Sequence, residues 1–199
     1  MKHFKKIRDS IDLTAVLDEL ASQTDAWAED TSRQTKVKCQ RETETIFLRS
    51  VAKPVPAGVN ANDVHPSRLT RMAKRFPKAL ELCEAIAAGE NGRLARATIV
   101  KLLPNGRVYP HIDHGNYYRI RDRYHLVLVS QAGSPLITGE ETAVLQTGEL
   151  WVFDNKVRHE ARNTSSAPRI HLIFDIEPAP GEGHYIYPEI EPAARASAA

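Results

Sequence analysis

The first part of the chain has the hydrophobic pattern of helices, with one short strand between them. Residues 11–29 place leucine and valine side chains at helical spacing, with acidic side chains on the opposite face. Residues 67–88 are also helical in pattern; Ser67 is a candidate N-cap, and Pro77 either ends the segment or begins a second helix. Residues 44–51 have the pattern of a strand. We therefore expect amphipathic helices whose apolar faces pack on the rest of the fold.

From residue 95 onward, the pattern changes to β-strands. Short apolar or alternating segments occupy residues 95–103, 107–112, 121–130, 134–139, 142–146, 149–154, 159–163 and 168–176. Turn-forming residues separate several of them, at 104–106, 139–140 and 147–148. No helical segment intervenes, so a doubly wound α/β fold is disfavoured. Closely spaced short strands predict a mainly β fold, an antiparallel sandwich or barrel, with a jelly roll among the favoured forms.

These patterns suggest one domain over residues 1–178. Its parts are a helical N-terminal part, 1–94, and a β-rich core, 95–178, with the helices on the outside. Residues 53–66 contain proline, glycine and asparagine and are expected to form a loop. Residues 179–199 are rich in proline, alanine and glutamate, and we expect a flexible tail.

Composition narrows the class of protein without indicating its chemistry. The chain has 199 residues, 42% of them hydrophobic, and a net charge of +2. So small a charge, spread along the chain, does not predict nucleic-acid binding, and no apolar run is long enough for a membrane span. The two cysteines, Cys39 and Cys83, have no spacing that pairs them. We therefore expect a cytoplasmic globular protein.

A candidate metal site begins at His111 and Asp113. In an extended segment, residues two apart project to the same side, so both side chains can reach one metal ion. His159 is the candidate third ligand. Two imidazoles and one carboxylate leave coordination positions open, as in non-haem Fe(II) oxygenases, whereas zinc usually takes a more closed tetrahedral set. His114 is expected to point away from these ligands, and Asp154, Asn155 and Glu160 are candidates for orienting the His159 ring.

Two groups of basic residues suggest an anionic ligand. Arg169 begins an apolar strand and is costly to bury unless it is paired. Its guanidinium can pair with an internal carboxylate or grip the distal carboxylate of a dicarboxylic acid; we favour the ligand, because Asp175 lies well along the same strand. In residues 121–130, alternation places Arg121, Arg123 and His125 on one face. That face suits either an anionic ligand or solvent.

Together these motifs resemble the aspartyl/asparaginyl β-hydroxylase family of 2-oxoglutarate-dependent oxygenases, which includes bacterial proline hydroxylases. The matching segments are His-Ile-Asp at 111–113, Arg-Tyr-His at 123–125, Gly-Glu-Leu-Trp-Val-Phe-Asp at 148–154, His-Glu-Ala-Arg-Asn at 159–163, and Arg169 with Leu-Ile-Phe-Asp at 172–175. The resemblance implies a double-stranded β-helix of the jelly-roll, cupin-like kind.

The resemblance also implies a set of roles. His111, Asp113 and His159 would bind Fe(II), and Arg169 would hold the distal carboxylate of 2-oxoglutarate. Arg123 and His125 would be further cosubstrate contacts. The implied reaction is an O2-dependent hydroxylation of an unactivated C–H bond, with release of succinate and CO2. The family's animal members carry Gly where this chain has Asp113, and related halogenases lack the carboxylate as well, so Asp113 favours hydroxylation.

The sequence leaves the substrate open. Candidate substrate contacts are Arg41, Arg49, Asn116, Arg119 and Arg121. A free amino acid or related small molecule is favoured, and an Asp, Asn or other side chain of a peptide or protein is the alternative. Two alternatives come from other classes of protein: a non-catalytic cupin-like binding module, and a zinc or manganese hydrolase or isomerase. His171 shares the parity of Arg169 and either lines the pocket or is a core histidine, while His184 has no assigned role.

Overall fold

The computed structural model describes residues 1–51, 58, 63 and 65–182. Most of the expected loop at 53–66 lies outside these residues. So do residues 183–199 of the expected tail, including His184.

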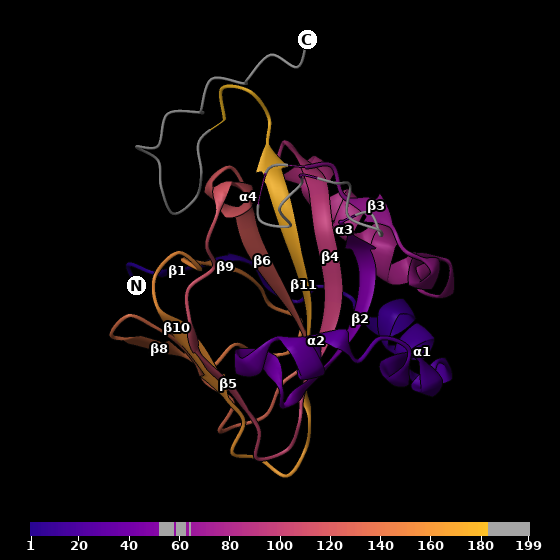
Figure 1. Cartoon of the computed structure of the whole chain (residues 1–199), viewed down its shortest axis with the longest axis vertical. Helices are drawn as coiled ribbons and strands as arrows, with labels where there is room; N and C mark the ends of the chain where they lie inside the picture. The colour runs from indigo at the N-terminus through magenta and orange to yellow at the C-terminus, as the bar shows by residue number, and fades with distance from the viewer. Residues whose placement is uncertain (52–57, 59–62, 64, 183–199) are drawn as a thin grey trace.

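The described chain forms two antiparallel sheets that face each other (Figure 1). The major sheet has the order β1-β9-β6-β11-β4-β2-β3 and the minor sheet the order β5-β10-β7-β8. The strands of the major sheet are β1 (Phe4–Arg8), β2 (Thr43–Ser50), β3 (Arg68–Leu69), β4 (Gly92–Leu102), β6 (Asp122–Val129), β9 (Leu150–Phe153) and β11 (Arg169–Pro178). Those of the minor sheet are β5 (Arg107–His111), β7 (Leu136–Thr138), β8 (Glu141–Ala143) and β10 (His159–Arg162).

The path of the chain between the sheets is that of a jelly roll. From β4 to β11 the chain alternates between major and minor sheet, except for the hairpin β7–β8, which stays in the minor sheet. Every strand pairing is antiparallel, as the closely spaced strands and turns predict. All eight segments expected to be strands after residue 95 are strands, and the double-stranded β-helix is confirmed.

The N-terminal part is less helical than expected. Its three strands β1, β2 and β3 extend the major sheet at both edges, so residues 1–94 do not form a separate helical layer. Strand β1 pairs with β9, although its sequence, Phe-Lys-Lys-Ile-Arg, lacks a clear strand pattern. Its lysines suit an edge strand, where charged side chains keep further strands from pairing.

The helices begin and end differently from the prediction. The segment 11–29 divides into α1 (Thr14–Ser22) and a 3-10 helix, η1 (Thr24–Ala28). The segment 67–88 divides into β3, the 3-10 helix η3 (Arg71–Arg75) and α3 (Pro77–Gly89). Ser67 is therefore not an N-cap; the Thr70 hydroxyl caps η3 by accepting from the Met72 amide at 3.1 Å. Pro77 begins a new helix, at a position where its missing N–H costs nothing.

Three further helices are short. They are α2 (Ser32–Lys36), η2 (Lys38–Gln40) and α4 (Asn116–Arg119). Helix α2 contacts β2 of the major sheet, and η2 contacts β5 of the minor sheet, so this segment crosses from one sheet to the other. No helix in the described part of the chain has the length and apolar character needed to cross a lipid bilayer.

Two apolar cores lie on opposite faces of the major sheet. The larger lies between the sheet and helices α1 and α3, which cover its outer face in Figure 1, and it includes Tyr124, Leu126 and Leu128 of β6. The smaller lies between the two sheets and includes Val127 of the same strand. The alternation predicted for residues 121–130 is therefore confirmed from Arg123 to Leu128, where it leaves the inner face of β6 for the site, whereas Val129 packs against the outer core next to a register shift in the pairing with β11.

Truncating Leu126 should test the outer core. Its side chain is fully buried (0% exposed), so Leu126→Ala should lower the free energy of unfolding by about 2–5 kcal/mol in a urea titration. Leu69→Ala is the matched control: Leu69 is 55% exposed, and its loss should cost no more than about 0.5 kcal/mol. Equal losses for the two variants would contradict this assignment of the core.

Candidate metal centre and adjoining cavities

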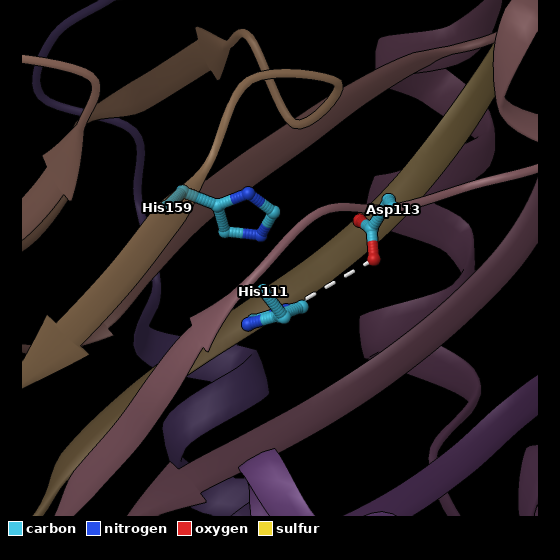
Figure 2. A group of neighbouring side chains, drawn as sticks. All are labelled: His111, Asp113 and His159. Atoms are coloured by element: carbon cyan, nitrogen blue, oxygen red, sulfur yellow. Dashed lines mark ion pairs between the residues drawn. The ribbon is translucent and has the colours of Figure 1, made fainter.

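Three side chains converge at the open end of the barrel. His111 ends β5, His159 begins β10, and the two are direct partners in the antiparallel ladder; Asp113 follows β5 by two residues. One ligand atom of each lies within 4.8 Å of the others, and Figure 2 shows the three side chains turned toward one another. The Nε2 atom of His111 is 4.0 Å from Oδ1 of Asp113. Such a set can hold one divalent metal ion and leave part of its coordination sphere open.

Backbone carbonyls orient both imidazole rings. The Nδ1 of His111 lies 2.7 Å from the Tyr109 carbonyl, and the Nδ1 of His159 lies 2.9 Å from the Val157 carbonyl. A carbonyl only accepts, so each ring donates from Nδ1, and Nε2 is the atom that remains to bind a metal. Burial lowers the pKa of His159 to about 4, which keeps this ring neutral at pH 7.

The residues expected to orient His159 have other roles. The Asn155 side chain donates to Oδ2 of Asp113 at 2.9 Å, Asp154 lies 3.6 Å from a ring nitrogen of His3, and Glu160 pairs with two arginines. That prediction was wrong because no sequence pattern marks a backbone carbonyl as the partner.

Arg123 links the candidate ligand Asp113 to a second carboxylate. It donates from Nη1 to Asp113 Oδ2 at 2.7 Å, and from Nε and Nη2 to the two oxygens of Asp175 at 2.8 and 3.1 Å. Burial alone would raise the pKa of Asp113, but the charge of Arg123, supported by His159 and the Asn155 hydrogen bond, lowers it. Asp113 is therefore ionised and held in place. A contact between Arg123 and a cosubstrate stays a prediction beside this observed role.

Deeper in the barrel, Arg169 is buried beside two histidines. Its Nη2 lies 3.3 Å from Nδ1 of His171, and that atom lies 3.1 Å from Nδ1 of His125. Because a guanidinium only donates, His171 Nδ1 accepts, His125 donates from Nδ1, and the proton of His171 is on Nε2. Burial and the charge of Arg169 hold the pKa of both histidines well below the usual value, so both are neutral.

This cluster fits an anion. Within the described chain, Arg169 has no carboxylate partner, and Asp175, six residues farther along β11, is engaged by Arg123. Two buried donors, Arg169 Nε and His171 Nε2, have no hydrogen-bond partner among the described residues. Burial lowers the pKa of Arg169 to about 10, which leaves it charged at pH 7. An internal salt bridge for Arg169, the alternative left open by the sequence, is thereby excluded for the described residues.

Two cavities adjoin the candidate metal site, and the lining residues follow the same order along strands β11 and β6. Along the inward face of β11, Arg169 and His171 line the first cavity, Ile173 lines both, and Asp175 lines the second. Strand β6 agrees, with His125 in the first cavity and Arg123 in both. Successive inward residues are about 6.7 Å apart along a strand, so the anion cluster and the second cavity lie on either side of a central position. Arg123, bonded to Asp113, marks that position.

The five predicted substrate residues lie in different environments. Arg49 lines the second cavity. The prediction for Arg121 was wrong. Its guanidinium is buried and donates to Glu177 at 2.6 Å and to the Tyr117 carbonyl at 3.1 Å, so Arg121 forms a structural ion pair. Arg41 is exposed and stacks 3.7 Å from the Tyr109 ring centroid. Asn116 and Arg119 are exposed on α4.

Arg33 was not predicted from the sequence to be a residue of the site. Arg33 on α2 lines both cavities and thus lies close to Arg123. Its segment reads as an unremarkable polar stretch, and only the packing of α2 against β2 brings it to the site. His114, by contrast, is exposed as expected.

Comparison with known proteins identifies the family of this chain. The model of the aspartyl/asparaginyl β-hydroxylase family matches residues 2–178. An L-proline cis-4-hydroxylase of Rhizobium meliloti (strain 1021) is 30% identical over 112 residues, which cover 56% of this chain and 39% of that enzyme. The chain thus matches about two fifths of the relative's length.

Solved structures share the fold at low sequence identity. A 2OG-Fe(II) oxygenase family oxidoreductase from Burkholderia pseudomallei superposes with a TM-score of 0.52 at 13% identity, covering 86% of this chain and 93% of that one. A Pseudomonas putida prolyl-4-hydroxylase gives a TM-score of 0.51 at 14% identity, covering 90% and 94%. Since the family model spans nearly all of the described residues, the chain belongs to the aspartyl/asparaginyl β-hydroxylase family.

Proposed function

We propose that this protein is an Fe(II)- and 2-oxoglutarate-dependent dioxygenase that hydroxylates an unactivated C–H bond of a free amino acid or related small molecule, with release of succinate and CO2. One observation carries the proposal. His111, Asp113 and His159 bring ligand atoms within 4.8 Å of one another, beside a buried arginine that has no carboxylate partner among the described residues. A zinc hydrolase would have no use for that arginine.

In this proposal, different residues bind the metal, bind the cosubstrate and position the metal ligands. His111, Asp113 and His159 would hold the iron, and Arg169, with the free donor of His171, would hold the distal carboxylate of 2-oxoglutarate. When bound, iron and 2-oxoglutarate together supply the activation of O2. The chain fixes the ligands: Arg123 and Asn155 keep Asp113 charged and oriented, and the neutral His125 and His171 add no competing charge. No protein nucleophile or general base is needed.

Several features support the wider assignment. The presence of β1 and β11, from the two ends of residues 1–178, in one sheet supports a single domain over this range. The relative that is an L-proline cis-4-hydroxylase favours a small molecule over a peptide. The second cavity, of about 390 Å³, is within the range of small-ligand pockets. Free Cys39 and Cys83 suit a reducing cytoplasm.

The test is turnover with defined components. Purified protein with Fe(II), 2-oxoglutarate and air should form succinate, and a panel of amino acids and their derivatives should contain members that stimulate its release and gain one oxygen atom by mass spectrometry. Adding a chelator should stop both. If peptides were hydroxylated and no amino acid or derivative were, the substrate would be a peptide. Absence of succinate under all conditions would refute the enzyme assignment.

A further inference from the structure

The second cavity carries an excess of positive charge. Its lining includes five basic side chains, Arg33, Lys36, Arg49, Arg96 and Arg123. Asp175 is the acidic member of the described lining, and it already accepts two hydrogen bonds from Arg123 and one from the Tyr117 hydroxyl. Arg123 is paired in this way and Arg96 contacts His65 and Tyr117, so the excess of positive charge rests on Arg33, Lys36 and Arg49.

Arg33 is the basic group best placed for a ligand. Its guanidinium makes no hydrogen bond or ion pair with any residue that the structure describes, and its side chain is half-buried, 6.0 Å from the ring of Phe47. Burial, and then the charge of Arg123, lower the pKa of Arg33, since both disfavour another cation in this position. An arginine left unpaired in such a position is costly until an anion binds.

Two neighbouring basic side chains, Arg49 and Lys36, add to the positive charge around Arg33. Arg49 donates to two backbone carbonyls, those of Ala95 at 3.0 Å and Ser67 at 3.2 Å. Carbonyls are neutral, so these bonds fix the position of the guanidinium but leave its charge in the cavity. Lys36 is exposed at the rim.

Arg33 lies close to the candidate metal site. Arg33 and Arg123 line both cavities, and Arg123 is bonded to the candidate ligand Asp113. A group held by Arg33 would thus lie beside the candidate metal site, on the side away from Arg169. Phe47, Tyr118 and Ile173 supply aromatic and apolar walls for the carbon skeleton.

We propose that the substrate is a small molecule with a net negative charge, an acidic or N-acylated amino acid, whose carboxylate binds Arg33 in the second cavity. This inference rests on the proposed function and narrows it. A free ammonium group finds no available carboxylate in the described lining, so zwitterions with one carboxylate, such as proline itself, should be poor substrates. Arg33 is therefore a specificity-determining residue.

The experiment compares Arg33→Gln with Arg93→Gln in two assays. Arg93 is a matched control, because its side chain is 74% exposed and pairs with Glu177 away from both cavities. Calorimetry measures the binding of glutamate, N-acetylproline and proline to the protein without added metal. Succinate release with Fe(II) and 2-oxoglutarate measures KM and kcat for the same compounds.

We expect the two anionic compounds to bind and to stimulate succinate release better than proline. Arg33→Gln should raise their Kd and KM by roughly 10- to 100-fold, the effect of losing a charge-assisted hydrogen bond, while Arg93→Gln should change neither. The inference is overturned if proline is preferred, or if Arg33→Gln leaves Kd and KM of the anions unchanged. Succinate formation missing in the wild type, with anion binding still lost in Arg33→Gln, would refute the enzyme assignment and keep the anion site.

Discussion

Replacing Arg169 by methionine is expected to remove 2-oxoglutarate binding without destabilising the protein. Arg169 is 7% exposed and its guanidinium faces no carboxylate in the described chain, so burial of this charge is unfavourable until a ligand compensates it. Methionine keeps the length and most of the volume of the side chain. The Kd for 2-oxoglutarate should rise by roughly 10²- to 10³-fold, as for other truncated buried charge pairs, and the free energy of unfolding should stay the same or rise by about 1–4 kcal/mol. Calorimetry and urea titration measure the two quantities.

Arg121→Met is the matched control for this pair of measurements. Arg121 is also buried, but Glu177 accepts from it at 2.6 Å. Loss of the Arg121 guanidinium leaves the Glu177 carboxylate without one of its cations. The free energy of unfolding should therefore fall by about 1–3 kcal/mol, while the affinity for 2-oxoglutarate should be retained. If Arg169→Met instead lost stability and kept its affinity, Arg169 would be a structural residue and the cosubstrate site would lie elsewhere.

Replacing His111 by alanine is expected to remove metal binding and succinate formation together. His111 supplies one of three ligand atoms, and its ring is already held by the Tyr109 carbonyl at 2.7 Å. Metal affinity should fall by more than the roughly 10- to 100-fold typical of residues that only orient a ligand. Titration with Fe(II) under nitrogen, and succinate release in air, measure the two effects.

The control lies three residues along the chain. His114 is exposed and takes no part in the ligand group, so His114→Ala should bind Fe(II) and form succinate like the wild type. Comparable losses in the two variants, or unchanged metal binding in His111→Ala, would show that the metal is held by other residues.

The local parts of this site were predictable because strand geometry acts over short distances. The alternation along β6 predicted that Arg123 and His125 share a face, and the His-x-Asp spacing predicted that His111 and Asp113 meet. Strand β1 was missed because an edge strand needs only one apolar side to be buried, and Phe4 and Ile7 give too little pattern over five residues.

Ion pairs between residues far apart in the chain could not be predicted from the sequence. Nothing in the chain predicts that Asp175 would pair with Arg123 rather than Arg169, or that Glu177 would take Arg121, because both depend on the register of β11 against its neighbours. Arg33 is the clearest case: it lies about 80 residues before Asp113, and only the crossing of α2 and η2 between the sheets brings it to the cavity.

The central claim is that one site binds Fe(II) and 2-oxoglutarate together, and a spectrum taken without oxygen tests it most directly. Adding 2-oxoglutarate to the protein with Fe(II) under nitrogen should produce a weak charge-transfer band in the visible region, saturating at one equivalent of each. The band should be absent in His111→Ala and should require far more 2-oxoglutarate in Arg169→Met. A wild-type protein that gives no such band and binds zinc tightly instead would contradict the account.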